Sequence, residues 1–249
     1  MYLGPQSSST FQDSNKTFKS TYGSGEVEGD IISDNVNIAG FSLDQHVFGV
    51  ALLESSEFSD TVIDGLMGLA RSTISAQGVL TPIESLAKLG LIDEAITSYK
   101  LGRASDGNND GEITFGGLDE SKFDPSTLVT FPNVSPNGFW EGGISISIDG
   151  KDLGLQGRTA ILDTGTTLLY VPSADAEAIH ARIPGSKSCD GYFTIPCTST
   201  SVVSLTFGGR AFDINPIDLL FYTVDENNLQ GECVSSITPG QFGGPKQWL

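Results

Sequence analysis

The chain has 249 residues, enough to bury a large core in one domain or in two smaller lobes. Its formal net charge is -18, which argues against nucleic acid or an anionic membrane surface as a partner, because phosphate groups are bound by Lys and Arg. No apolar run is long enough to span a bilayer, and no His–Cys spacing indicates zinc.

Two N-glycosylation sequons occur, Asn15-Lys16-Thr17 and Asn133-Val134-Ser135. Two sequons can arise by chance, but they fit a secreted protein. The first stands just before a predicted β-hairpin, in which alternating residues flank a flexible tip, Gly23-Ser24-Gly25. A Gly-rich phosphate loop is a poor alternative there, because the spacing is wrong and no helical pattern follows.

Strand patterns continue through residues 31–38, turn at Ala39-Gly40, and resume over residues 47–53. Residues 62–70 are an apolar run whose glycines allow close approach of another backbone. Residues 106–111 begin like a calcium loop, but the twelfth position is Gly117 where a bidentate Glu is needed. We therefore expect a polar turn, with neither a metal nor a cofactor.

A short helix is predicted from Pro82 until Gly90. Thr81 is its expected N-cap, and Glu84 completes a capping box. Its apolar residues share one face, which is typical of core packing: Ile83, Leu86 and Leu89.

The composition of residues 132–138, rich in Pro, Asn, Ser and Gly, predicts a boundary between two lobes, residues 1–137 and 138–249. After it, residues 142–148 alternate as a strand, and Asp149-Gly150 is a hairpin turn.

A carboxylate follows the next apolar run, in the stretch Thr159-Ala160-Ile161-Leu162-Asp163-Thr164-Gly165-Thr166-Thr167. A buried Asp is costly unless it is hydrogen-bonded, and here Gly165 lets the backbone bring its N–H toward Asp163. Thr164 and Thr166 supply hydroxyls that can hold one rotamer. The alternative is a strand that simply ends in an Asx-turn.

A second helix is predicted with Ser173 as its cap, acidic residues Asp175 and Glu177 in its first turn, and an end before Pro184. His180 lies on this helix and is expected to be solvated. Short strands follow at residues 192–195, 202–207 and 211–214. Two short helices among many short strands indicate an all-β architecture.

The pattern of two apolar residues, Asp-Thr-Gly-Thr-Thr and two more apolar residues resembles the second active-site loop of pepsin-like aspartic proteases, peptidase family A1. The hairpin resembles the family's flap, and residues 62–70 resemble the strand that crosses behind its first active-site loop. The pair Phe139-Trp140 near the lobe boundary fits as well. The resemblance implies an all-β, bilobal fold with a few short helices and a deep cleft.

The resemblance implies that Asp163 is catalytic and that Thr164, Gly165 and Thr166 support its loop. Three flap residues are then expected to bind substrate: Tyr22, Gly23 and Ser24. From the residues alone, Tyr22 is equally well explained as an aromatic that packs across the strands.

The resemblance also implies a Cys197–Cys233 disulfide, and such a bridge stabilises by roughly 3–4 kcal/mol in the loop-entropy model. Cys189 is then left over.

The sequence departs from the family pattern in one respect that determines whether we expect this chain to be active. The family uses two Asp-Thr-Gly loops, whereas this sequence has one, at Asp163. The first catalytic aspartate and the second crossing strand are missing, so we expect a fragment truncated at both ends. In the family the two carboxylates share one proton, and the ionised member takes a proton from the attacking water. We therefore expect an aspartic endopeptidase by family that is inactive as this chain.

The expected partners are peptide or protein substrates, and the expected state is a monomer. Secretion or a vacuolar or lysosomal location is expected, although the chain shows no signal peptide. The alternative function is a non-catalytic peptide-binding or interaction protein of the same fold. A homodimer that pools two copies of Asp163 is a further possibility. A Ser–His hydrolase and a glycosidase are disfavoured, because no partner residue stands out in the sequence.

Overall fold

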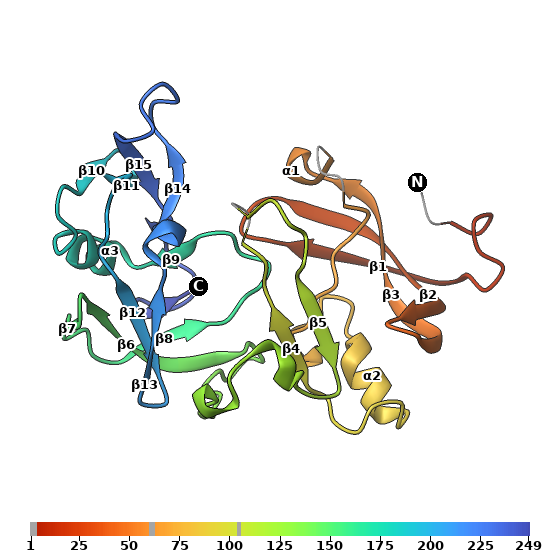
Figure 1. Ribbon diagram of the computed structural model, residues 1–249. Helices are drawn as coiled ribbons and strands as arrows, with labels where there is room; N and C mark the ends of the chain where they lie inside the picture. The colour runs from red at the N-terminus through yellow and green to blue at the C-terminus, as the bar shows by residue number, and fades with distance from the viewer. Residues whose placement is uncertain (1–3, 60–62, 104–105) are drawn as a thin grey trace. The chain divides into compact units, whose positions relative to one another are not determined.

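A computed structural model describes residues 4–59, 63–103 and 106–249 of the chain. It contains two compact units, Met1–Thr127 and Leu128–Leu249 (Figure 1). Short strands predominate over short helices, as an all-β pepsin-like fold requires. The first unit ends at Thr127, upstream of the boundary predicted at residue 137. That the two units correspond to the two predicted lobes stays a prediction.

Unit 1 is built on an antiparallel three-stranded sheet of order β1-β2-β3, with β1 (Gln12–Thr21), β2 (Glu26–Ile38) and β3 (Phe41–Glu54). The predicted hairpin is confirmed, since Thr21 pairs with Glu26 around the tip. The predicted turn at Ala39-Gly40 is confirmed too. Both residues have positive φ, 49° and 85°, as a two-residue hairpin turn of this type requires.

The helices of unit 1 are short: α1 (Ser56–Ser59), the 3-10 turn η1 (Ser72–Ile74), α2 (Pro82–Lys88), η3 (Glu120–Lys122) and η4 (Pro125–Thr127). The capping box of α2 forms as predicted between Thr81 and Glu84. Leu86 of this helix is fully buried. Leu89, however, is 62% exposed, so its predicted place in the core is wrong. It lies beyond the last helical turn, as the C-cap residue.

A second hairpin in unit 1 joins β4 (Thr97–Lys100) and β5 (Glu112–Phe115). The residues predicted as a polar turn, 106–111, lie in its connection. There Asp110 forms an ion pair with Lys100, which holds the connection against β4.

The predicted crossing strand at residues 62–70 is not formed over its described part, residues 63–70; Val62 lies outside the described residues. Ile63, Leu66 and Met67 are 52%, 58% and 48% exposed. A strand needs a neighbour that satisfies its N–H and C=O groups, and no described strand pairs with these residues. An apolar run alone was therefore not sufficient to predict a strand.

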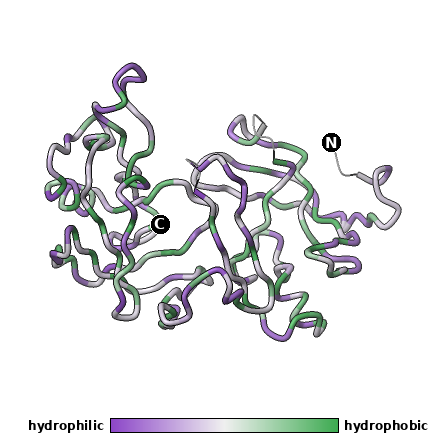
Figure 2. The backbone as a smooth tube through the Cα atoms, in the orientation of Figure 1, coloured by the Kyte–Doolittle hydropathy of each residue, from purple (hydrophilic) through white to green (hydrophobic). Residues whose placement is uncertain are grey.

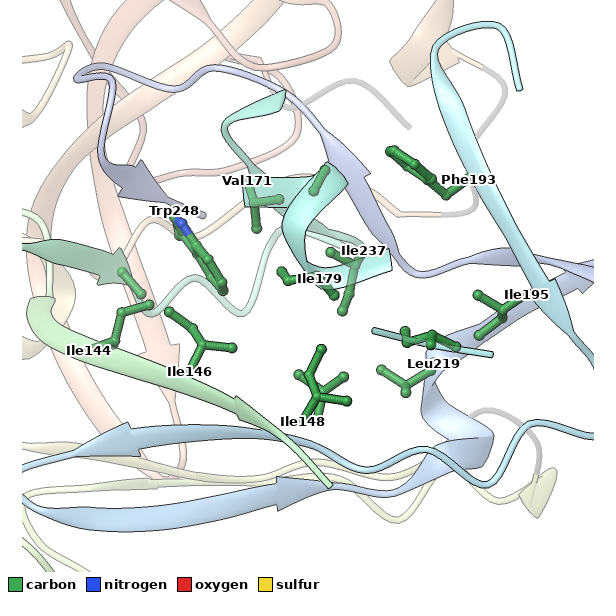
Figure 3. Close-up of a cluster of buried hydrophobic side chains, with 14 of the residues drawn as sticks. Ile144, Ile146, Ile148, Val171, Ile179, Phe193, Ile195, Leu219, Ile237 and Trp248 are labelled. Atoms are coloured by element: carbon green, nitrogen blue, oxygen red, sulfur yellow. The ribbon is translucent and has the colours of Figure 1, made fainter. Parts of the chain in front are cut away.

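Unit 2 contains a six-stranded sheet of order β13-β12-β6-β8-β17, with β7 beside β6. Its strands are β6 (Glu141–Ile148), β7 (Lys151–Asp152), β8 (Arg158–Ile161), β12 (Val203–Phe207), β13 (Arg210–Ile214) and β17 (Gln247–Trp248). The predicted alternation is confirmed in β6, where Ile144, Ile146 and Ile148 point into the core (Figure 3). The Asp149-Gly150 turn follows, with φ of 50° and 73°.

A four-stranded sheet of order β10-β11-β15-β14 forms the other side of unit 2. It comprises β10 (Lys187–Cys189), β11 (Tyr192–Pro196), β14 (Leu220–Thr223) and β15 (Glu232–Ser235), with η5 (Pro216–Leu219) before β14. The Cys197–Cys233 disulfide joins the end of β11 to β15, and Cys189 is free. The β14–β15 connection, residues 224–231, is mostly hydrophilic (Figure 2).

Two short parallel strands and a helix complete unit 2: β9 (Leu169–Val171), β16 (Ile237–Pro239) and α3 (Ser173–His180). Val171, Ile179, Ile237 and Trp248 are fully or almost fully buried and belong to one hydrophobic cluster (Figure 3). Ala160 of β8 belongs to it along with Val171 of β9, so the cluster packs against both strands.

Two predictions about α3 were wrong. Ser173 is the first helical residue rather than the cap; the N-cap is Pro172, whose backbone carbonyl accepts from the N–H groups of Asp175 and Ala176. His180 is not solvated but only 2% exposed, and its ring stacks on Phe193 at 4.0 Å between centroids. The buried residues of α3, Asp175, Ala176, Ile179 and His180, lie on one face of the helix, so this face buries two polar side chains along with the apolar ones.

Candidate active site

The Asp163 loop, residues 162–168, connects two strands of the unit 2 core, β8 and β9. Before the loop, β8 lies between β6 and β17. After the loop, β9 pairs with β16. Strands paired in this way hold both ends of the loop, so the position of Asp163 is determined by the core beneath it.

Both carboxylate oxygens of Asp163 are held by the loop itself. Oδ1 accepts a hydrogen bond from the Gly165 N–H at 2.8 Å, and Oδ2 accepts one from the Thr166 hydroxyl at 2.6 Å. The sequence predicted both donors, but it also suggested Thr164, which makes no such bond in the described structure. The carboxylate is exposed rather than buried, because it lies beyond the end of β8.

A glycine is required at position 165 because the Asp163 carboxylate lies close to its Cα, and not because the backbone there has a positive φ. Its φ is not positive, but a Cβ built on it would lie 3.2 Å from Asp163 Oδ1, closer than most such contacts. A side chain at this position would push the carboxylate away from the N–H that holds it. Since a carboxylate has about four acceptor positions, the two bonds leave Asp163 able to accept a proton from a water or a substrate.

The last residues of the chain lie between the strands on either side of the Asp163 loop. Trp248 pairs with Ala160 of β8. Leu249 exchanges two backbone hydrogen bonds with Tyr170 of β9, at 2.7 and 3.0 Å. The sequence pattern alone predicts no element for this segment. In the structure it contains the strand β17 and bridges β8 to β9.

A buried polar cluster fixes three segments around the loop: Arg158 of β8, Asp175 of α3 and Trp248 of β17. Arg158 donates two hydrogen bonds to Asp175, from Nε at 2.7 Å and from the terminal nitrogen at 2.6 Å. The Trp248 indole N–H donates to Asp175 Oδ2 at 2.9 Å. Burial acts to raise the pKa of Asp175, but the bonds from Arg158 and Trp248 outweigh it and lower the pKa.

The predicted flap residues, Tyr22, Gly23 and Ser24, form the exposed tip of the β1–β2 hairpin in unit 1. The Tyr22 N–H donates to the Gly25 carbonyl at 2.9 Å, which closes the turn. The Tyr22 ring makes an edge-to-face contact with Phe58 of α1, at 5.4 Å between centroids. Asp163 and its loop belong to unit 2, so the predicted flap residues and the Asp163 loop lie in different units.

The junction of β3 and α1 holds this tip. Glu26 and Ser55 share two hydrogen bonds: the Ser55 N–H donates to the Glu26 carbonyl, and the Glu26 N–H donates to the Ser55 hydroxyl, both at 3.0 Å. Gly25 packs so closely that a Cβ there would lie 2.4 Å from the Ser55 hydroxyl. The tip is therefore anchored at its base and at Tyr22, while Gly23 and Ser24 project into solvent.

Sequence reasoning missed the residues that position these groups. The sequence indicates Asp175 only as an acidic residue in a first helical turn, and it gives no indication of a positioning role for Arg158 or Phe58. Local sequence contains no cue that Trp248, 73 residues away, donates to Asp175. Across the described residues, no three His, Cys, Asp or Glu side chains are placed to hold a metal, and none of the helices is long and apolar enough to cross a membrane.

Comparison with known proteins matches residues 2–247 to the eukaryotic aspartyl protease family. The probable aspartic-type endopeptidase CTSD of Arthroderma benhamiae is 38% identical over 99% of this chain and 48% of its own length. Rhizopuspepsin-1 of Rhizopus niveus is 36% identical over 95% of this chain and 60% of its own length. A probable vacuolar protease A of Arthroderma benhamiae is 35% identical over 96% of this chain and 59% of its own length.

The chain thus spans about half to three fifths of the length of these relatives. The family match covers both units, including the β1–β2 hairpin and the Asp163 loop. The chain belongs to the eukaryotic aspartyl protease family.

Proposed function

We propose that this chain carries one half of the catalytic machinery of an aspartic endopeptidase, with Asp163 as one member of a carboxylate pair. The observation that carries the proposal is the geometry of the loop. An exposed carboxylate is held at both oxygens by Gly165 and Thr166, at the end of a core strand. A fixed, solvent-accessible carboxylate is what a general base needs in order to activate a water.

The chemistry of this class needs a second carboxylate. Two neighbouring acids share one proton, so that the ionised one takes a proton from water while the protonated one polarises the peptide carbonyl. The 249 residues contain one Asp-Thr-Gly, at Asp163. We infer that the chain by itself lacks the group that would polarise the carbonyl and that it does not turn over peptides.

The proposed substrates are peptides and proteins in extended conformation. Tyr22, Gly23 and Ser24 are proposed to contact them, since the hairpin tip offers an exposed aromatic ring, backbone groups and a hydroxyl. The names of the relatives, which include a vacuolar protease and rhizopuspepsin-1, support a secreted or vacuolar location for the protein.

The single Asp-Thr-Gly favours a second candidate function, a peptide-binding protein without catalysis. Turnover is tested by assaying the purified chain at acid pH on an unfolded protein substrate, beside its Asp163→Asn variant, and the two functions are separated by the effect of the same variant on peptide binding. Calorimetry with a statine-type peptide measures binding in parallel. We expect no Asp163-dependent cleavage by this chain. Cleavage that Asp163→Asn abolishes would show a complete catalytic site. Peptide binding that Asp163→Asn leaves unchanged would favour a binding protein that does not use this carboxylate.

A further inference from the structure

The asparagines of the two glycosylation sequons, Asn15 and Asn133, differ in whether their side chains are hydrogen-bonded to the rest of the chain. The Asn133 side chain makes three hydrogen bonds: Nδ2 donates to the Phe139 carbonyl at 2.8 Å, while Oδ1 accepts from the N–H groups of Ser135 at 3.0 Å and Glu141 at 3.2 Å. These bonds close the segment that leads into β6. A sugar on Nδ2 would replace one of its two hydrogens and add a bulky group beside the Phe139 carbonyl, so a glycan on this asparagine would disturb contacts that the fold already makes.

Asn15 lies instead in a bulge of strand β1. Asp13 pairs with Ile32 and Lys16 pairs with Ile31, so two residues of β1, Ser14 and Asn15, have no opposite partner. The φ of Asn15 is 55°, a left-handed conformation that Asn adopts more readily than most residues.

Neighbouring side chains satisfy the backbone of this bulge. Asp13 accepts from the Asn15 N–H at 2.8 Å. The Ser14 hydroxyl donates to the Ile31 carbonyl and accepts from the Lys16 N–H. The Asn15 amide is exposed and has no hydrogen-bond partner within the described part of the chain. It can therefore carry a bulky substituent without the loss of any contact.

The second group of this sequon is accessible as well. Thr17 is exposed, and its hydroxyl likewise has no partner among the described residues. A left-handed backbone alone would explain an asparagine at position 15, but it would not require an exposed hydroxyl two residues later. The side-chain amide and hydroxyl of the Asn15 sequon are thus both exposed and make no hydrogen bonds among the described residues. The Asn133 side chain, in contrast, is hydrogen-bonded to its own segment.

We propose that Asn15 is the N-glycan acceptor of this chain and that Asn133 is not. In the modification, Asn15 Nδ2 forms a bond to C1 of the first sugar of a lipid-linked oligosaccharide and loses one proton. The bond from C1 to the pyrophosphate oxygen of the lipid breaks, and the lipid pyrophosphate leaves. This assignment is independent of the proposed catalytic role of Asp163.

A glycan at Asn15 would cover the open edge of the unit 1 sheet. In the order β1-β2-β3, strand β1 is at an edge, and most of its residues are exposed. Open strand edges invite pairing with other chains, and proteins protect them with bulges, charges or covering groups. The bulge already bends this edge, and a glycan on it would block the approach of a further strand.

The test expresses the full 249-residue chain behind a heterologous secretion leader in a eukaryotic host. Enzymatic deglycosylation in 18O-water, followed by peptide mass spectrometry, then marks each asparagine that carried a glycan. We expect occupancy at Asn15 to be several-fold higher than at Asn133. Equal occupancy, higher occupancy at Asn133, or no glycan at either position would overturn the assignment.

A matched pair of variants tests the sequon without altering the bulge. Thr17→Val keeps the shape of the side chain but removes the hydroxyl, and we expect it to abolish the glycan on Asn15. Thr17→Ser keeps the sequon, and we expect the glycan to remain. If a variant is not secreted, the occupancy measured on the parent chain still decides between the two asparagines.

Discussion

Arg158 and Asp175 form a two-point ion pair, with donor–acceptor distances of 2.7 and 2.6 Å, between the strand that leads into the Asp163 loop and the helix that follows it. The Asp175 side chain is 1% exposed and that of Arg158 is 16% exposed. The pair therefore links the two elements on either side of the proposed catalytic carboxylate, in surroundings where an uncompensated charge is costly.

Removal of one partner of this pair should destabilise unit 2 strongly. We expect Arg158→Met, or Asp175→Asn, to lower the free energy of unfolding by about 3–5 kcal/mol, because the other charge stays buried without its partner. The double variant should lose less than the sum of the two single losses. Urea unfolding followed by tryptophan fluorescence measures this, since both tryptophans lie in unit 2.

Two exposed residues provide matched controls for this prediction. Lys151→Met removes a cation from β7, and Glu177→Gln removes a charge from α3 itself. Both changes should alter stability by less than about 0.5 kcal/mol, as surface substitutions usually do. An effect of Arg158→Met no larger than that of Lys151→Met would contradict the role given to the buried pair.

A second prediction concerns the two glycines of the hairpin tip, since the structure leaves room for a side chain at Gly23 but not at Gly25. Gly25 has φ of 84° and would place a Cβ 2.4 Å from the Ser55 hydroxyl, so Gly25→Ala should destabilise the hairpin by about 1–3 kcal/mol. Gly23 has open space around it, so Gly23→Ala should be neutral or stabilise by up to about 1 kcal/mol. Hydrogen exchange of β1 and β2 amides measures both. Faster exchange in Gly23→Ala than in Gly25→Ala would refute the anchoring described for the tip.

Buried His180 should make unit 2 less stable as the pH falls. A carbonyl can only accept, so Nδ1 donates to the Ala176 carbonyl at 2.7 Å, and Nε2 accepts from the Ser235 hydroxyl at 2.9 Å. Burial lowers the pKa of this neutral ring from its ordinary value of 6.5. Below about pH 6.5 the unfolded chain therefore binds a proton that the folded chain does not, and stability falls by up to about 1.4 kcal/mol per pH unit.

The His180→Gln variant isolates this contribution. It also removes the stacking on Phe193, so the quantity to compare is the slope of unfolding free energy against pH, rather than stability at one pH. His46 is present in both chains and cancels in the comparison. Between about pH 6.5 and 5 the variant should show a flatter slope. Identical slopes would mean that His180 binds its proton as readily in the folded chain as in the unfolded one, which would contradict the lowered pKa.

Local sequence predicted much of the fold, because the relevant contacts lie within a few residues. The capping box of α2 joins Thr81 to Glu84. The bonds that hold Asp163 come from residues two and three positions later, so they too were predictable. The Asp149-Gly150 hairpin turn follows from two residues that tolerate positive φ.

The remaining features depend on contacts between distant residues and carry no local signal. His180 bonds with Ser235, 55 residues away, and that partner decides that the ring is buried rather than solvated. Asp175 likewise meets Arg158 across 17 residues. At residues 63–70 the apolar pattern predicted a strand, but a pattern does not supply the neighbouring strand that pairing requires.

The most direct test of Asp163 as one member of a catalytic pair uses a chimera. These 249 residues replace the matching part of the Arthroderma benhamiae relative, which supplies the remainder of its own chain. The measured quantity is kcat/KM on an unfolded protein substrate at acid pH, with Asp190→Asn as a surface control. We predict that Asp163→Asn lowers kcat/KM by about 10²–10⁴-fold and that Asp190→Asn leaves it unchanged. A chimera that keeps its activity within a few-fold after Asp163→Asn would contradict the assignment.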